Sequence, residues 1–184
     1  MQTVPTLLRL LAGLETGVLG AILLLVWFSL DAVYQGQHWY AFPNLWATLF
    51  FGQDAFRMRA GWATASGISI HLLLLSLEGA VFGAIWRWSR WFWLTLAAGI
   101  LWAMLCYWGM NLSLWKNFAP FVPRMMPQPA TGLAVLLFGI CLSRIPVRAE
   151  KLAFQVFGSP AIPIAVPLMQ PPPLPPPLPP FEES

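Results

Sequence analysis

The stretch "SGISIHLLLLSLEGAVFGAIW", residues 66–86, decides the fold class because it is long and apolar enough to cross a bilayer. Two ionisable residues, His71 and Glu78, interrupt its apolar run. An ionisable group inside a membrane span is costly unless it is paired or faces a cavity, so it predicts a functional or partner-contacting position. The stretch therefore indicates a membrane-spanning helix that carries polar groups into the interior of a bundle.

The composition of the whole chain agrees with this interpretation. Its 184 residues are 58% hydrophobic and 9% charged, and their mean hydropathy is +0.67. Soluble domains carry about a quarter charged residues, so the composition predicts an all-α integral membrane protein in contact with the lipid bilayer. The ten basic residues are scattered singly or in pairs. This scatter does not favour nucleic acid as a partner.

Four apolar segments are predicted to be transmembrane helices, and the fourth is short. The segments are Leu10–Leu30, Gly61–Trp86, Trp91–Trp115 and Ala130–Ser143. A span needs about 20 residues, and the fourth segment has only 14, so a re-entrant segment is the alternative there. In the long connection at 35–60, "NLWATLFFG" predicts a short helix in the membrane interface.

The chain divides into three parts by composition. Residues 1–146 form the predicted four-helix transmembrane domain. Residues 147–158, "VRAEKLAFQVFG", alternate polar and apolar positions at helical spacing, which predicts an amphipathic interfacial helix. Residues 159–184 include "PPPLPPPLPP" and are predicted to form an extended polyproline II tail, because proline-rich sequence forms neither helix nor sheet.

Basic residues set the expected orientation. With four spans, six Arg or Lys residues fall on the side of the two termini and four on the other side. The positive-inside rule then places both termini in the cytoplasm. We expect a multi-pass protein of a bacterial inner membrane.

Three ionisable residues lie inside predicted spans: Glu15, His71 and Glu78. His71 and Glu78 are seven positions apart, so they share one helix face about 10 Å apart along the axis. In an up–down hairpin, Glu15 and Glu78 lie at similar depth, where they could share a proton or hold a cation. Alternatively, each acid is neutral and hydrogen-bonds a nearby hydroxyl or backbone carbonyl. For His71 the alternatives are a hydrogen bond across the bundle, a contact with a partner subunit, or axial ligation of a haem or chlorophyll-type pigment.

Two glycine motifs predict close helix packing. "GLETG" (13–17) and "GAVFG" (79–83) both have the GxxxG spacing that lets helix backbones approach each other. Gly13 and Gly17 lie on the side of the first span opposite Glu15. If these glycines form the helix contact, Glu15 points elsewhere.

The proline-rich tail is the best candidate for a partner-binding segment. Polyproline II is already extended, so it loses little entropy when it docks on another chain. The candidate contact residues are Pro171, Leu174, Pro175, Leu178 and Pro179. The alternative is a solvated, disordered tail without a binding role.

These features together favour a non-catalytic accessory subunit of a larger bacterial membrane complex, of the respiratory or photosynthetic kind that carries out electron transport. The sequence contains no nucleophile–base pair, metal motif or phosphate loop, so an enzyme is not expected. One alternative is a small proton or cation transporter that uses Glu15, Glu78 and His71. A second alternative is a haem- or chlorophyll-binding subunit with His71 as the axial ligand. If the chain binds a small molecule, these alternatives predict that it is a lipid, a haem or a chlorophyll-type pigment.

Overall fold

A computed structural model describes residues 5–86, 92–120, 122–126 and 128–157 of the chain. Every regular element in these ranges is a helix. The predicted partner-binding residues of the tail, and the whole of 159–184, lie outside the described residues.

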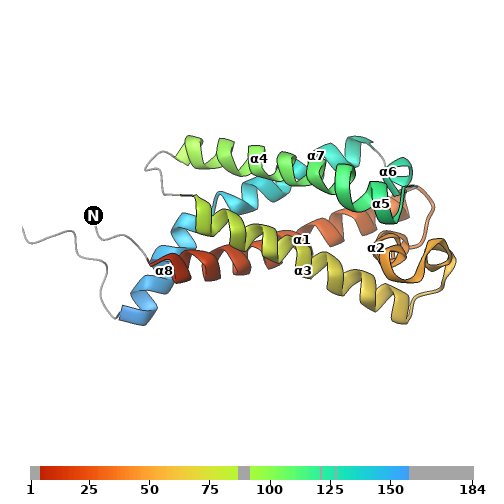
Figure 1. Cartoon of the computed structure of the whole chain (residues 1–184), viewed down its shortest axis with the longest axis horizontal. Coiled ribbons are helices and arrows are strands. Elements are labelled where there is room, and N and C mark those ends of the chain that lie inside the picture. The colour runs from red at the N-terminus through yellow and green to blue at the C-terminus, as the bar shows by residue number, and fades with distance from the viewer. Residues whose placement is uncertain (1–4, 87–91, 121, 127, 158–184) are drawn as a thin grey trace, which may run out of the picture.

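The described elements run in the order α1, α2, η1, α3, α4, η2, α5, α6, α7 and α8 (Figure 1). Their bounds are α1 Thr6–Tyr34, α2 Ala41–Phe51, η1 Gln53–Arg57, α3 Trp62–Ile85, α4 Phe92–Gly109, η2 Met110–Trp115, α5 Lys116–Phe118, α6 Val122–Met125, α7 Gln128–Leu142 and α8 Ile145–Phe157. Four helical stretches are long and apolar enough to cross a membrane: Thr6–Tyr34, Trp62–Ile85, Phe92–Phe118 and Pro129–Phe157. The prediction of an all-helical chain with four candidate spans is thereby confirmed.

The two GxxxG motifs pack against each other. A Cβ atom added to Gly79 would lie 2.9 Å from the Cα of Gly17 and still closer to the carbonyl oxygen of Gly13. A Cβ atom on Gly17 would lie 2.6 Å from the carbonyl oxygen of Leu75. The backbones of α1 and α3 thus touch where side chains are missing, as the spacing predicts. This seam makes α1 and α3 the most closely packed pair of helices in the bundle.

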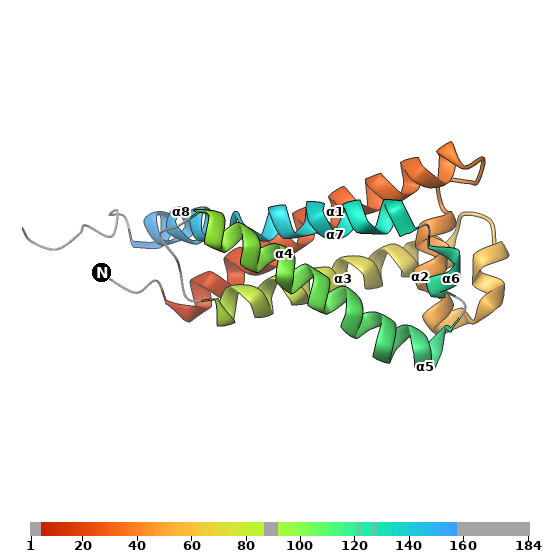
Figure 2. The same ribbon diagram turned by 90° about the horizontal axis from the view of Figure 1, so that it is seen from above.

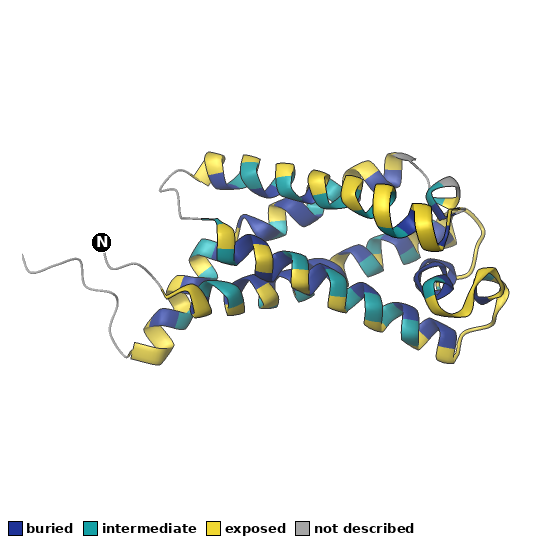
Figure 3. Ribbon diagram, in the orientation of Figure 1, coloured by how far each residue is buried: buried dark blue, intermediate teal, exposed yellow. Residues whose placement is uncertain are grey.

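A second glycine seam joins α4 to α7. A Cβ atom on Gly99 would lie 2.6 Å from the carbonyl oxygen of Gly139, and one on Gly139 would lie 2.6 Å from the Cα of Ile100. By contrast, α4 makes few contacts with α3. Figure 2 shows α4 running obliquely across the other long helices, and Figure 3 shows much of its surface exposed. The bundle therefore consists of two tight pairs, α1 with α3 and α4 with α7, and α7 also packs on α1.

The helix of the fourth predicted span, α7, is followed closely by the last described helix, α8. The sequence predicts a short span that ends at Ser143 and a separate surface helix from residue 147. In the structure only a two-residue turn separates α7 from α8, and the two form one apolar helical stretch from Pro129 to Phe157. Ala149 and Ala153 are buried, and α8 packs on α1. That α8 lies at the membrane surface remains a prediction.

The connection after α1 folds back into the bundle. The first eight residues of α2, Ala41 to Thr48, are all buried. Asn44 fixes this helix, because its side-chain amide donates to the carbonyl of Met58 at 2.8 Å and its oxygen accepts from the Thr64 hydroxyl at 2.7 Å. Gly67 on α3 lies directly against the carbonyl of Pro43. The short helix thus closes one end of the bundle.

The two described ends of the chain lie at the opposite end of the bundle. Figure 1 shows the start of α1 and the end of α8 together, away from α2. This arrangement is the one expected for an even number of crossings. Which side of a membrane this end faces remains a prediction.

Candidate functional site

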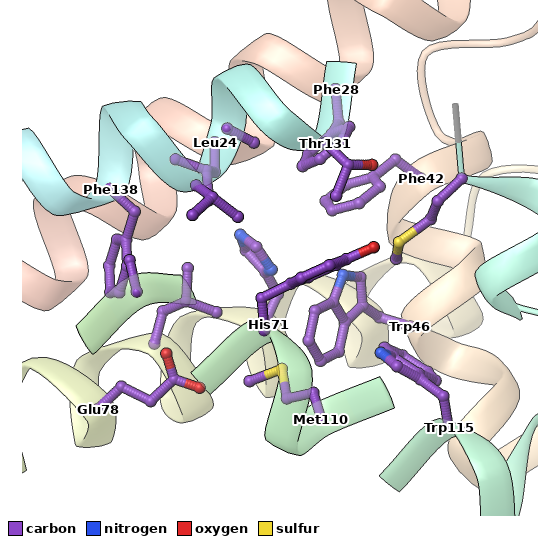
Figure 4. A pocket seen from close by; sticks show the side chains of 16 residues that line it. Leu24, Phe28, Phe42, Trp46, His71, Glu78, Met110, Trp115, Thr131 and Phe138 are labelled. Atoms are coloured by element: carbon purple, nitrogen blue, oxygen red, sulfur yellow. The ribbon is translucent and has the colours of Figure 1, made fainter. Parts of the chain in front are cut away.

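A cavity lies at the centre of the bundle, bordered by α1, α2, α3, α4 with η2, and α7 (Figure 4). Its volume is about 80 Å³, measured as the space open to the centre of a water molecule. Its lining residues are Leu24, Phe28, Phe42, Trp46, His71, Leu75, Glu78, Ala103, Tyr107, Met110, Trp115, Met126, Thr131, Ala134, Val135 and Phe138. Most of these side chains are aliphatic or aromatic. The cavity therefore suits an apolar occupant better than an ion or a chain of waters.

His71 is the buried polar centre of the site. Its side chain is 1% exposed, and its Nε2 lies 3.0 Å from the carbonyl oxygen of Ala21 on α1. Because a carbonyl can only accept, Nε2 must carry the proton in this hydrogen bond. In the neutral ring Nδ1 is then an acceptor, and it has no hydrogen-bond partner among the described residues. The prediction that His71 faces the protein interior is confirmed.

Aromatic rings surround the His71 imidazole. The ring centroid of Trp46 lies 5.1 Å from that of His71, and the ring centroid of Phe42 lies 5.4 Å away. Trp115 continues the cluster, 4.9 Å from Trp46, and Phe28 stacks on Phe42 at 4.2 Å. Edge-to-face contacts of this kind hold the rings in fixed orientations. They make a rigid wall on one side of the cavity.

The turn of π-helix at η2 directs two side chains into this wall. It places Trp115, which is 2% exposed, in the core and Met110 on the cavity lining. Single π-turns within α-helices occur frequently at functional sites. Here the irregular turn lies where α4 meets the cavity.

Trp46 contributes a second unpartnered polar atom to the site. Its side chain is 4% exposed, and its indole Nε1 finds no acceptor in the described part of the chain. Neighbouring side chains enclose this nitrogen. Nδ1 of His71 and Nε1 of Trp46 are thus both enclosed by protein atoms and without a hydrogen-bond partner among the described residues.

Glu78 lines the same cavity at a distance from these rings. Its carboxyl points into the cavity from α3 (Figure 4). Across the α3–α4 junction, the thiol of Cys106 lies within hydrogen-bonding reach of this carboxyl. The structure thus brings His71 and Glu78 to one face, as their spacing predicts.

Glu15 does not belong to this site. Its carboxylate lies 3.4 Å from the guanidinium of Arg148 on α8. The glycines of α1 face α3, so Glu15 points away from Glu78. The hypothesis that the two carboxylates share a proton or hold a cation therefore has no geometric support.

The aromatic wall is the part of the site that sequence reasoning missed. The sequence placed residues 44–52 in the membrane interface and treated tryptophans as interface anchors. The available signal was the four-residue spacing of Phe42 and Trp46, which puts both rings on one face of a short helix. That face packs on His71 instead of lipid headgroups.

The geometry around His71 does not favour axial ligation of a metal. Its Nε2 is engaged by Ala21, and the rings of Phe42 and Trp46 pack on its sides. A tetrapyrrole is much larger than the cavity. Among the described residues, no group of three or more His, Cys, Asp or Glu side chains is placed to hold a metal ion.

Comparison with protein-family models, with curated proteins and with solved structures finds no match to this chain.

Proposed function

We propose that the protein is a non-catalytic membrane protein that binds a small, mainly apolar molecule in the cavity at the centre of its bundle. The observation that carries this proposal is the cavity itself, with its mainly apolar lining and a few polar side chains among the lining residues, such as Glu78 and Tyr107. An apolar pocket with a few convergent polar groups is the usual form of a small-molecule site. Lipid-like molecules are the occupants that such a protein would meet in a bilayer.

Entry from the side is the natural route to this cavity. The cavity is lined by both α3 and α4, although these two helices make few contacts with each other. A molecule dissolved in the bilayer could therefore enter between them without separating a glycine seam. Glu78 and Cys106 would lie at this junction.

The proposal is tested by narrowing the cavity. Ala103 lines it and is 4% exposed, so Ala103→Leu fills space there. The protein is extracted in mild detergent, and bound molecules are counted by native mass spectrometry and identified by their mass and absorption spectrum. We expect a bound apolar molecule in the parent protein and its loss in Ala103→Leu.

The control is Ala97→Leu, which adds the same side chain at an exposed position of α4. It should retain the bound molecule. Equal occupancy in both variants, or no bound molecule in the parent protein even after incubation with total membrane lipid, would contradict the proposal.

The accessory-subunit role predicted from the sequence is a second candidate. The observation that favours it is the low burial of α4. In an apolar 18-residue segment of the candidate span Phe92–Phe118, only 17% of the residues are buried. In the other three candidate spans the corresponding share is 39% to 44%. A partner subunit of a bacterial inner-membrane complex could cover this face, with both termini on the cytoplasmic side. The two roles are compatible, because the cavity is lined from inside the bundle and the exposed residues of α4 remain free for a partner.

A further inference from the structure

We propose that the molecule bound in the cavity is a small organic cation, such as a protonated amine with an apolar body, and that its positive charge pairs with the carboxylate of Glu78. This inference rests on the proposed function and adds the chemical class of the ligand. Glu78 lines the cavity from α3, and its carboxyl points into it (Figure 4). Its side chain is partly exposed, in contrast to the enclosed imidazole of His71, which is 1% exposed.

Glu78 has no basic side chain beside it. The described residues that line the cavity include no arginine or lysine. The imidazole of His71, two helical turns away, is bonded to Ala21 and packed against aromatic rings. The thiol of Cys106 lies within hydrogen-bonding reach of the Glu78 carboxyl, but a thiol is a weak donor and carries no positive charge. The described lining of the cavity therefore holds an acid without a counter-charge.

The other acid of the predicted spans, Glu15, shows the contrast. Its carboxylate lies 3.4 Å from the guanidinium of Arg148. A carboxylate at membrane depth is costly unless it has such a partner or faces a cavity. The carboxyl of Glu78 faces a cavity instead of a basic side chain. A bound cation would supply there the charge that Arg148 supplies to Glu15.

The remainder of the lining selects an organic cation over a metal ion. A metal ion needs several ligand atoms around it, and the described residues place no group of three or more His, Cys, Asp or Glu side chains to supply them. Most of the lining is aliphatic or aromatic, with rings such as those of Trp46 and Tyr107. An apolar body fills such a space, and aromatic faces also attract an organic cation.

The two ends of the cavity match a molecule with a charge at one end. Glu78 lies about 10 Å along α3 from His71, and the rings of Phe42 and Trp46 pack on His71. The acidic end lies where α3 meets Cys106 of α4, at a junction with few helix contacts. A ligand that enters there from the bilayer can leave its charge at Glu78 and place its apolar body toward the aromatic rings.

Three probes of equal size test the charge pairing in the full-length protein in lipid nanodiscs. They are benzylamine, benzyl alcohol and ethylbenzene, which place an ammonium, a hydroxyl or a methyl group at the same position. We expect benzylamine to bind about tenfold more tightly than either neutral probe, because it alone forms a charged hydrogen bond with Glu78. The methyl signal of Met110, which lines the cavity and is assigned by its loss in Met110→Leu, reports binding there.

Substitutions of the two acids assign the preference to Glu78. In Glu78→Gln the side chain keeps its size and loses its charge, so the preference for benzylamine over ethylbenzene should disappear. In Glu78→Asp the charge remains on a shorter side chain, so part of the preference should remain. The matched control is Glu15→Gln, which removes a carboxylate outside the cavity and should leave the preference unchanged. Each comparison is made between ligands within one variant, so a general loss of stability does not produce this pattern.

The carboxyl carbon signal of Glu78 provides an independent readout, which also decides if Glu78→Gln fails to fold. Glutamate labelled with ¹³C at the side-chain carboxyl is introduced, and the signal is assigned by its loss in Glu78→Asp. Benzylamine should shift this signal, while ethylbenzene at the same occupancy should leave it nearly unchanged.

The outcomes separate the cation from the proposed function. Equal affinities for all three probes would overturn the cation and leave the apolar site standing, since Glu78 would then be a neutral acid hydrogen-bonded to Cys106. A preference for benzylamine that persists in Glu78→Gln would overturn the pairing with this residue. Binding of none of the probes in the cavity would overturn both proposals.

Discussion

The carboxylate of Glu15 on α1 lies 3.4 Å from the guanidinium of Arg148 on α8. This contact joins two residues that are far apart in the sequence, one on the first helix and one on the last described helix. It gives Glu15, an acid within the first predicted span, a basic partner that the sequence pattern did not identify. It also ties α8 to the side of α1 opposite the glycine seam.

This ion pair should contribute modestly to stability. Both side chains are more than two-fifths exposed, and pairs of this kind contribute up to about 1 kcal/mol. In a double-mutant cycle of Glu15→Gln and Arg148→Gln, we expect a coupling energy of that size in the free energy of unfolding. Titration with a denaturing detergent measures it. The exposed acid Glu150 supplies the control: Glu150→Gln should show no coupling to Arg148→Gln, and equal coupling would refute the specific pair.

The glycine seam should be far more sensitive than the ion pair. In Gly79→Ala the new methyl group meets the backbone of α1 at Gly13 and Gly17, which cannot move aside as a flexible side chain can. We expect a loss of about 1–3 kcal/mol in the free energy of unfolding. Gly132 on α7 is the matched control, because a Cβ atom there meets nothing within 4 Å.

Gly132→Ala should be neutral or slightly stabilising, since alanine is the better helix former. Both variants are measured under the same detergent conditions. If Gly79→Ala unfolds with the same midpoint as Gly132→Ala, the helices are not in backbone contact at this seam.

The spans were predictable because apolar length and glycine spacing are local properties of the sequence. Span boundaries follow from runs of apolar residues, and GxxxG predicts a close approach without knowledge of the partner. The contact between Gly13 and Gly79 shows that the two motifs pair with each other.

The cavity was not predictable because it depends on residues far apart in sequence. His71 and Glu78 share a helix, and their common face follows from spacing alone. Trp46 and Trp115 reach the site only because α2 folds back and a π-turn rotates the end of α4. The pairing of Glu15 with Arg148 depends on the angle of α8. No local pattern encodes these arrangements.

The side chain of Asn44 should be essential for holding α2 in place. It is fully buried and bridges Met58 and Thr64. In Asn44→Asp, a carboxylate oxygen replaces the amide that donates to the carbonyl of Met58, so two acceptors face each other. We expect a loss of about 2–3 kcal/mol in the free energy of unfolding.

Acidic solution should recover part of this loss, because a protonated carboxyl regains one donor. The exposed residue Asn117 gives the matched control. Asn117→Asp should change the unfolding midpoint little at either pH. A pH-independent loss in Asn44→Asp would show that the amide does not act through this hydrogen bond.

The tail should bind a partner and contribute nothing to folding of the bundle. The described helices, which end at Phe157, already form both glycine seams and the cavity. A chain truncated before Gly158 should therefore insert and unfold like the full-length protein. If residues 159–184 dock as polyproline II, with Leu174 and Leu178 filling shallow pockets, the truncated chain should lose its partner in co-purification from membranes.

A full-length variant separates side-chain recognition from mere length. Leu174→Ser with Leu178→Ser keeps every proline and the reach of the tail, but it removes the apolar groups between the prolines. We expect this variant to lose the partner as the truncated chain does. The wild-type association should persist in high salt because it is mainly apolar. If the truncated chain keeps every co-purifying subunit, the tail is not a docking segment, and the accessory-subunit proposal then depends on the outer face of α4 alone.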